Sequence, residues 1–264
     1  MKWLSMLLAV LSLVAVGAMP APAWHDHPDF ARLLADAGAR GTIVVLDEQA
    51  KRWHVADRAR AQRGFLPAST FKVFNALVAL DAGSVADEHE VIAWDGVERE
   101  FDSWNRDHDL ASGMKASAVW FYQEIARRSG ESRMRSSLER AGYGNGDLRA
   151  GIDRFWLEGG FRVTPVEQIT LLQRLADDAL PFTPRSQAIV RRVIEVDRGD
   201  GFVLRGKTGM LRPGTDGAIG WFVGWVERGE RRWFVAVNID LPDGALAPKR
   251  VALARDALAA VGAL

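Results

Sequence analysis

Ser69 and Lys72 are the residues of this chain whose types and spacing most clearly allow chemistry. Three positions apart on a helix, a serine hydroxyl and a lysine amine lie within reach of each other. Serine becomes a nucleophile when a nearby base takes its proton, and lysine is such a base only when its pKa is lowered. The apolar neighbours Phe71, Val73 and Phe74, together with the positive potential of a helix N-terminus, favour the neutral amine. Taken alone, the motif also fits an N-cap serine followed by a surface lysine.

Two further elements could contribute to the same site. Lys207-Thr208-Gly209 follows an apolar stretch with strand character, and a glycine there lets a ligand lie close to the strand edge. Lys207 and Thr208 could then bind an anionic substrate. Ser117 stands where a new helical pattern begins, so it offers a hydroxyl to a cleft or serves as an ordinary N-cap.

The composition excludes several classes of protein. The 264 residues are 48% hydrophobic and 26% charged, as in a globular chain of one large domain or two small ones. The 34 basic residues balance the 34 acidic residues, so no nucleic-acid partner is expected. With no cysteine, disulfides and thiolate chemistry are excluded. His25 and His27 have no third ligand nearby, so we interpret them as a frayed terminus and predict no metal site.

The N-terminal segment has the pattern of a secretory signal peptide. Met1-Lys2 precedes an apolar run over residues 3–19 and the small-residue triplet Ala21-Pro22-Ala23. The run is short for a membrane anchor, which is the alternative interpretation. We therefore expect cleavage after residues 1–23, no stable membrane anchor afterwards, and a periplasmic location.

The remaining residues, 24–264, read as a single domain of α/β composition, of the α+β type. Helices are predicted over 30–37, 68–82, most of 109–141, 165–179, 184–193 and 248–261. Strands are predicted over 41–46, 52–55, 202–207, 220–226 and 233–239. We expect a central antiparallel sheet of about five strands, flanked by helices, with hairpins from opposite ends of the chain. The residues between them, roughly 84–195, would form an all-helical lobe.

The order of the three elements resembles that of the penicillin-recognising serine enzymes. Ser69 precedes Ser117 by 48 residues, and Ser117 precedes Lys207 by 90, as in the Ser-x-x-Lys, Ser-Asp-Asn and Lys-Thr-Gly set of those enzymes. Ser-x-Val in place of Ser-Asp-Asn is similar to the class D β-lactamases, the oxacillinase family. Further marks agree with that family: Pro67-Ala-Ser-Thr-Phe-Lys72, Tyr143-Gly-Asn145, Phe155-Trp-Leu157 and Gly220-Trp-Phe-Val-Gly-Trp225.

The resemblance implies roles for the catalytic residues. Ser69 would attack the lactam carbonyl of a small-molecule β-lactam and form an acyl-enzyme. Lys72 would be carboxylated by carbon dioxide or bicarbonate and act as general base, with Trp156 holding the carbamate and no metal or organic cofactor. Ser117 would pass a proton to the lactam nitrogen, and Lys207 would keep the local potential positive.

The resemblance also implies how a substrate is held. Thr208 and Arg250 would bind its carboxylate, with Lys249 as an adjacent competitor for that role, and Gly209 would lie beside it. The backbone N–H groups of Ser69 and Met210 would form the oxyanion hole, although Met210 departs from the aromatic residue common in the family. Val119 and Leu157 would form an apolar gate over the lysine.

Other functions remain open on the sequence alone. A penicillin-sensing or penicillin-binding domain of the same fold would acylate without turnover, and a transpeptidase or carboxypeptidase would act on peptidoglycan. The Ser-x-Val and Phe-Trp-Leu marks favour the β-lactamase over these. The use of carbapenems or oxyimino-cephalosporins depends on residues 210–217, and the oligomeric state is open.

Overall fold

The computed structural model describes residues 23–212 and 217–264. The predicted leader, residues 1–23, therefore lies outside the described residues except for Ala23. Residues 213–216 of the segment 210–217 also lie outside them. No helix in the described part of the chain is long and apolar enough to cross a membrane.

The core element is one sheet of seven strands, in the order β1-β3-β2-β7-β6-β5-β4. Neighbouring strands are antiparallel, except that β1 runs parallel to β3. As predicted, β2 from the start of the chain pairs with β7 from its end. The strands are β1 (Trp24–Asp26), β2 (Gly41–Asp47), β3 (Arg52–Val55), β4 (Glu195–Gly199), β5 (Phe202–Met210), β6 (Ile219–Arg228) and β7 (Arg231–Asp240).

The prediction of about five strands missed the two edge strands, β1 and β4. β1 has three residues, and β4 reads Glu-Val-Asp-Arg-Gly with none of its residues buried. Edge strands are often short and charged, so the apolar alternation that reveals central strands is missing from them. The prediction of a frayed terminus at His25–His27 was also wrong. His25 lies in the edge strand β1 and pairs with His54 of β3.

Nine helices flank the sheet in the described part of the chain. They are α1 (Pro28–Asp36), α2 (Arg58–Ala61), α3 (Lys72–Asp81), α4 (Leu110–Ala116), α5 (Val119–Ser129), α6 (Glu131–Ala141), α7 (Pro165–Ala176), α8 (Pro184–Val193) and α9 (Lys249–Ala260). Short 3₁₀ turns are η1 (Ala68–Phe71), η2 (Asp102–Trp104) and η3 (Gly244–Leu246). The helical pattern predicted over 109–141 is divided at Ser117, which has a φ of 55°, and at Gly130, which has a φ of 79°.

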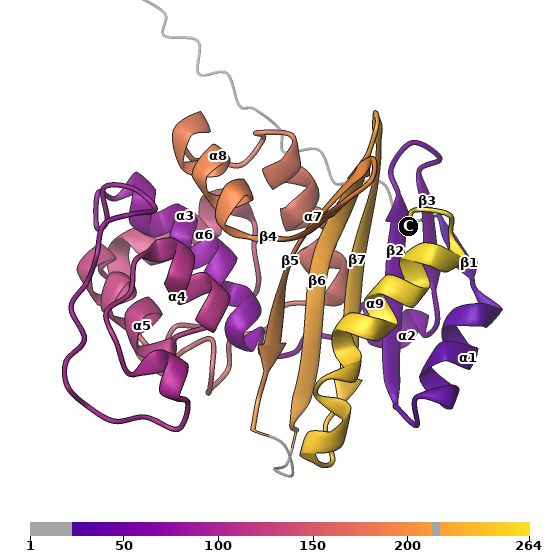
Figure 1. Cartoon of the computed structure of the whole chain (residues 1–264), viewed down its shortest axis with the longest axis horizontal. Helices are drawn as coiled ribbons and strands as arrows, with labels where there is room; N and C mark the ends of the chain where they lie inside the picture. The colour runs from indigo at the N-terminus through magenta and orange to yellow at the C-terminus, as the bar shows by residue number, and fades with distance from the viewer. Residues whose placement is uncertain (1–22, 213–216) are drawn as a thin grey trace, which may run out of the picture.

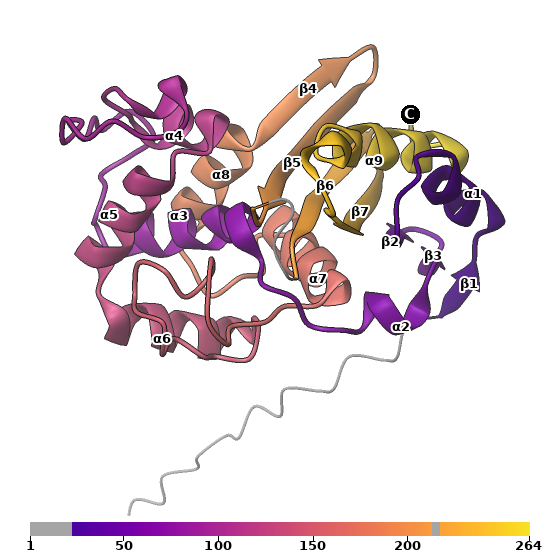
Figure 2. The same cartoon turned by 90° about the horizontal axis from the view of Figure 1, so that it is seen from below.

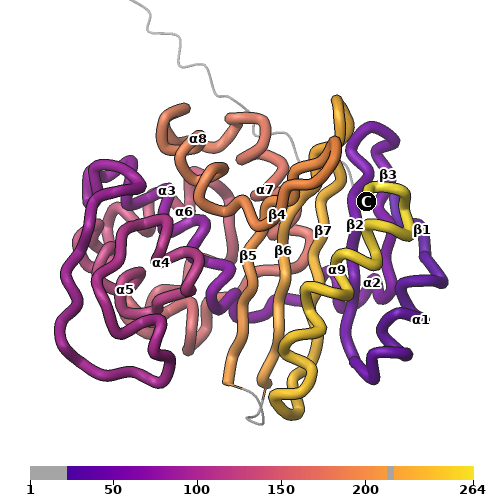
Figure 3. Tube along the Cα trace, in the orientation of Figure 1, coloured from indigo at the N-terminus to yellow at the C-terminus, as the bar shows by residue number. Residues whose placement is uncertain are grey.

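The helices cover both faces of the sheet and form a separate lobe beside it (Figures 1 and 2). α9 and α1 lie side by side on one face, so the two ends of the described chain meet there (Figure 3). On the opposite face α7 packs against β7, β6 and β2, although the predicted lobe of residues 84–195 includes it. The lobe is built around α3, which packs against α5, α8 and α6.

The strand sequences reflect burial on both faces. In β2, Val44 and Leu46 belong to the core under α7 and the helical lobe, whereas Ile43 and Val45 belong to the core under α1 and α9. Successive side chains of a strand point to opposite faces, so a sheet covered on both sides needs continuous apolar runs.

Phe71 stands at the centre of an aromatic cluster between the sheet and the lobe. Its ring lies 4.9–6.4 Å from five other rings, those of Phe74, Tyr143, Phe155, Trp156 and Phe161. The residue is fully buried, and it directly precedes Lys72. The cluster therefore holds the start of α3 in place.

Replacing Phe71 with leucine should lower the free energy of unfolding by about 1–3 kcal/mol, because ring contacts are lost and a partial cavity forms. Chemical denaturation measures this change. The exposed Val196→Ala variant is the control and should change stability by less than about 0.5 kcal/mol. Equal stability of Phe71→Leu and the wild type would contradict a central role for this ring.

Candidate active site

The turn that carries Ser69 is anchored from below by a chain of buried hydrogen bonds. The Thr70 hydroxyl donates to the Pro67 carbonyl at 2.7 Å, Gln168 of α7 donates to the Thr70 oxygen at 2.7 Å, and the Tyr143 hydroxyl donates to Gln168 at 2.9 Å. Ala68, just before Ser69, has a φ of 50°, a strained conformation for alanine. The anchored turn thus fixes the position of the Ser69 hydroxyl.

Lys72 is a buried lysine beside that hydroxyl. Its Nζ lies 2.6 Å from Ser69 Oγ, and the residue is 0% exposed. Burial, and secondarily the positive charge of Lys207, hold the pKa of Lys72 well below its usual value. A neutral amine can accept the proton of a serine hydroxyl. The structure therefore supports the predicted base and excludes the interpretation of Lys72 as a surface lysine.

Lys207 and Ser117 form a second hydrogen-bonded pair. Lys207 Nζ donates to Ser117 Oγ at 3.0 Å and to the Thr208 carbonyl at 3.0 Å. Burial, and then the charge of Arg250, lower the pKa of Lys207 to about 7. The N-cap interpretation of Ser117 was wrong, because Ser117 ends α4 in a left-handed conformation and Ala118 is the N-cap of α5. The left-handed turn breaks the helical run and brings the Ser117 hydroxyl to Lys207.

Gly209 has a physical role beside the predicted one. A Cβ at this position would lie 2.9 Å from the Pro67 carbonyl oxygen and 3.0 Å from Thr70 Cγ2. The glycine therefore lets β5 pack directly against η1, the turn that carries Ser69. It brings these two protein segments together and also lines the cavity described below, where the sequence predicts that a ligand lies close to the strand.

Arg250, and not Lys249, reaches the site from α9. Its Nη1 donates to the Gly209 carbonyl at 2.5 Å, and its Nε donates to the Ala247 carbonyl. A Cβ on Gly220 would lie 2.6 Å from Arg250 Cδ, so that glycine gives the arginine its path across β6. Lys249 instead donates to the Ala37 carbonyl at the end of α1.

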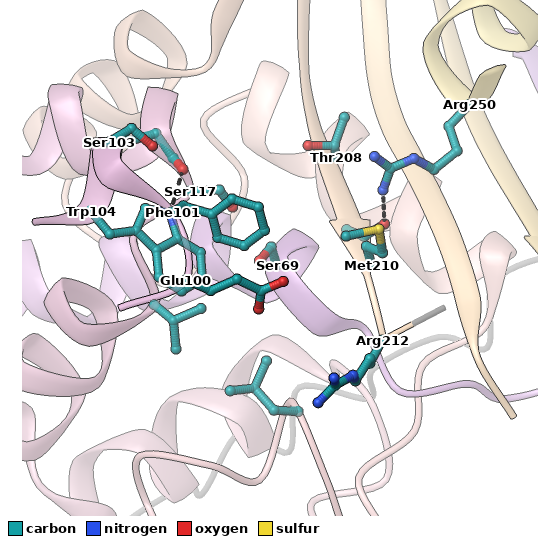
Figure 4. A pocket seen from close by; sticks show the side chains of 14 residues that line it. Ser69, Glu100, Phe101, Ser103, Trp104, Ser117, Thr208, Met210, Arg212 and Arg250 are labelled. Carbon is teal, nitrogen blue, oxygen red and sulfur yellow. Dashed lines mark hydrogen bonds between the residues drawn. The ribbon is translucent and has the colours of Figure 1, made fainter. Parts of the chain in front are cut away.

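Ser69 lines a cavity of about 340 Å³ between the sheet and the helical lobe (Figure 4). Eight residues predicted from the sequence line it: Ser69, Ser117, Val119, Leu157, Thr208, Gly209, Met210 and Arg250. Sequence reasoning missed six others: Glu100, Phe101, Ser103, Trp104, Ala116 and Arg212. Residues 100–104 carry no motif and no clear period, and the one signal in the sequence was an aromatic residue, Phe101, between the acidic residues Glu100 and Asp102. Lys72, Trp156 and Lys207 are not lining residues and lie buried in the protein.

Trp156 presents a buried donor that has no acceptor. Its ring stacks on Phe71 at 5.4 Å and 14°, and its carbonyl accepts the Ala68 N–H at 2.9 Å. The indole Nε1 has no hydrogen-bond partner among the described residues. Buried polar groups are nearly always paired, so an unpaired N–H in this core fits an acceptor that is added to the protein. The described residues contain no group of three or more His, Cys, Asp or Glu side chains that could hold a metal ion.

Comparison with known proteins assigns the family. The model of the penicillin binding protein transpeptidase domain matches residues 39–259. Beta-lactamase OXA-48 of Klebsiella pneumoniae is 40% identical over 89% of each chain. Beta-lactamase OXA-20 of Pseudomonas aeruginosa is 39% identical over 100% of this chain and 98% of its own.

Solved structures agree with these relatives. The class D β-lactamase YbXI from Nostoc has 40% identity and a TM-score of 0.86, over 89% of this chain and 99% of its own. FUS-1 (OXA-85), a class D β-lactamase from Fusobacterium nucleatum subsp. polymorphum, has 34% identity and a TM-score of 0.88, over 91% and 100%. The chain belongs to the class D β-lactamases. The predicted family and mixed α/β fold are thus confirmed.

The buried Lys207 should lower the stability of this class D β-lactamase at neutral pH. Its pKa is about 7 when folded, against an ordinary value of 10.5. The unfolded chain therefore binds an extra proton between these values, so wild-type stability should rise with pH across that window. Lys207→Met removes the penalty and should raise the free energy of unfolding below pH 7 by about 1–4 kcal/mol.

Denaturation of Lys207→Met and the wild type between pH 6 and about pH 10.5 measures the effect. The difference should shrink as the pH rises and disappear near the upper end. Lys115→Met, which removes an exposed lysine of α4, is the matched control. A Lys207→Met variant that is less stable than the wild type at every pH would show that burying this amine has no stability cost.

Proposed function

We propose that the protein hydrolyses the β-lactam ring of penicillin-type antibiotics through an acyl-enzyme on Ser69, and so confers antibiotic resistance. The observation that carries this proposal is the 2.6 Å contact between Ser69 Oγ and a buried lysine whose pKa is strongly lowered. The family of the chain supports the same activity, because its relatives at about 40% identity are named β-lactamases.

Substrate binding follows from the charges of the cavity wall. The Arg250 guanidinium and the Thr208 hydroxyl would bind the carboxylate of the antibiotic, because arginine suits a planar carboxylate. A substrate bound in this way would have its lactam carbonyl at Ser69. The backbone N–H groups of Ser69 and Met210 would then stabilise the oxyanion, an effect of about 3–4 kcal/mol for such donors.

Acylation requires two proton transfers. Lys72, when carboxylated on its amine by carbon dioxide, would take the proton from Ser69 Oγ as that oxygen attacks the carbonyl carbon. The C–N bond of the ring then breaks, and the lactam nitrogen needs a proton. Ser117 would deliver it, because its hydroxyl is hydrogen-bonded to Lys207. With a pKa of about 7, Lys207 is protonated in part of the molecules at neutral pH.

Carboxylation of Lys72 by carbon dioxide would supply the base for deacylation as well as for acylation. Two observations fit this modification: an amine that is neutral when buried, and the unpaired indole N–H of Trp156. Trp156 and Ser69 would hold the carboxylated side chain. The carbamate, when formed, supplies an anionic general base for the hydrolytic water. Val119 and Leu157 line the cavity and would control the access of that water.

Secretion belongs to the same proposal. The leader over residues 1–23 would direct the chain to the periplasm and be removed there, which leaves the enzyme without a membrane anchor. A penicillin-sensing or transpeptidase-like domain, which acylates without turnover, is not favoured by relatives named as β-lactamases.

A time course with excess benzylpenicillin tests the function directly. We expect sustained turnover of many equivalents by the mature protein, faster when bicarbonate is added, and a transient adduct on Ser69 in the mass spectrum. A burst of one equivalent that ends in a stable adduct would instead identify a sensor or transpeptidase. No reaction at all would contradict the proposed activity.

Replacing Trp156 with phenylalanine tests the role of its unpaired N–H. The variant keeps an aromatic ring in the core but removes the donor, so deacylation should slow by about 10-fold or more while acylation persists. Quenched-flow mass spectrometry should then show the acyl-enzyme accumulating. Trp233→Phe is the matched control, because Trp233 is also buried with an unpaired Nε1 but lies in the other core. Equal deacylation rates in the two variants would show that Trp156 contributes only to core packing.

A further inference from the structure

Glu100 is the one acidic residue among the described residues that line the cavity. Its carboxylate points into the cavity next to Phe101 (Figure 4). The residue is exposed, and no hydrogen bond or ion pair joins it to another described residue. The proposed chemistry does not use this carboxylate, and no contact within the described protein explains it.

The segment that carries Glu100 is nevertheless held firmly. The Arg99 N–H donates to the Asn105 side-chain oxygen at 2.8 Å, and the Asn105 amide donates back to the Arg99 carbonyl at 3.1 Å. The indole of Trp104 donates to the Ala116 carbonyl at 2.9 Å, directly before Ser117. Glu100 is thus held at a defined place relative to Ser117.

The cavity has walls of opposite charge. Arg250 and Arg212 line it from the side of β5 and α9, and Glu100 lines it from the side of the helical lobe (Figure 4). If the substrate carboxylate binds at Arg250, as the proposed function requires, the ring system lies over Ser69. The acylamino side chain, which is attached at the opposite end of the ring system, then extends along the wall of residues 100–104.

We propose that Glu100 makes this enzyme selective for the charge of the substrate side chain. It favours β-lactams that carry an ammonium group beside an aromatic ring and disfavours those that carry a carboxylate there. The rings of Phe101 and Trp104, 4.8 Å apart, provide an apolar surface for the aromatic part. Glu100 attracts the ammonium and repels the carboxylate, so the two substrates respond to its charge with opposite sign.

Three penicillins isolate this effect because they share one phenyl group. Benzylpenicillin has no charge on the side chain, ampicillin has an α-amino group, and carbenicillin has an α-carboxylate. We expect Glu100→Gln to lower the ratio of kcat/KM for ampicillin to that for carbenicillin by about tenfold, as a partly exposed charge interaction with each substrate would give. Glu100→Asp, which keeps the charge, should retain most of the ratio. High salt should reduce the wild-type ratio toward that of Glu100→Gln.

Glu98→Gln is the matched control. Glu98 is exposed two residues away and does not line the cavity, and its replacement changes the net charge by the same amount. In Glu98→Gln the ratio of kcat/KM for ampicillin to that for carbenicillin should stay within about twofold of the wild-type ratio, since a distant exposed charge is screened by solvent and salt. An unchanged ratio in Glu100→Gln, or an equal change in Glu98→Gln, would overturn the proposal. Benzylpenicillin distinguishes failure of this proposal from failure of the proposed function. Its side chain is uncharged, so its turnover by the wild type tests the β-lactamase activity whatever the ratio of ampicillin to carbenicillin turnover.

Discussion

The structure depends on the burial of Lys72 as a neutral amine. An ammonium at a fully buried position would cost several kcal/mol of desolvation, so the group loses its proton instead. Neutrality requires that every element around Lys72 exclude water, and this is what the helical lobe does by packing α5, α6 and α8 around α3. The aromatic cluster on Phe71 completes the apolar surroundings. The neutral state of Lys72, on which its action as a base depends, is therefore a consequence of how the core is packed around it.

Several unfavourable features gather around the same place. Lys207 is a second buried lysine, Trp156 has an unpaired indole N–H, and both Ala68 and Ser117 have positive φ angles. Each would be eliminated if stability were the only requirement, and such features persist where the surroundings over-determine them. Here the sheet, covered on both faces, and the relay from Thr70 through Gln168 to Tyr143 hold the strained segments in place.

The parts predictable from the sequence are those in which a local pattern determines the structure. The spacing of Ser69 and Lys72 on one helical turn was sufficient to predict their contact, and the continuous apolar runs predicted the central strands. The edge strands β1 and β4 were not predicted, because they are short or exposed to solvent and their sequences show no alternation of apolar and polar residues. The close packing of Gly209 against the turn of Ser69 depends on contacts between segments far apart in the chain. The same is true of the position of Arg250, and not Lys249, at the site. No local pattern contains that information.

This division between local and distant contacts also separates chemistry from selectivity in the cavity. Ser69 and Lys72 come from one helical turn, and their geometry is protected by the full burial of Lys72 and of its neighbours Thr70 and Phe71. The wall of residues 100–104 has no sequence motif and is held by a few hydrogen bonds through Asn105 and Trp104. A change of Glu100 or Phe101 leaves the packing around Lys72 untouched, because both side chains are exposed. The preference for a substrate side chain can therefore vary without weakening the base, whereas the base cannot vary without disturbing the core.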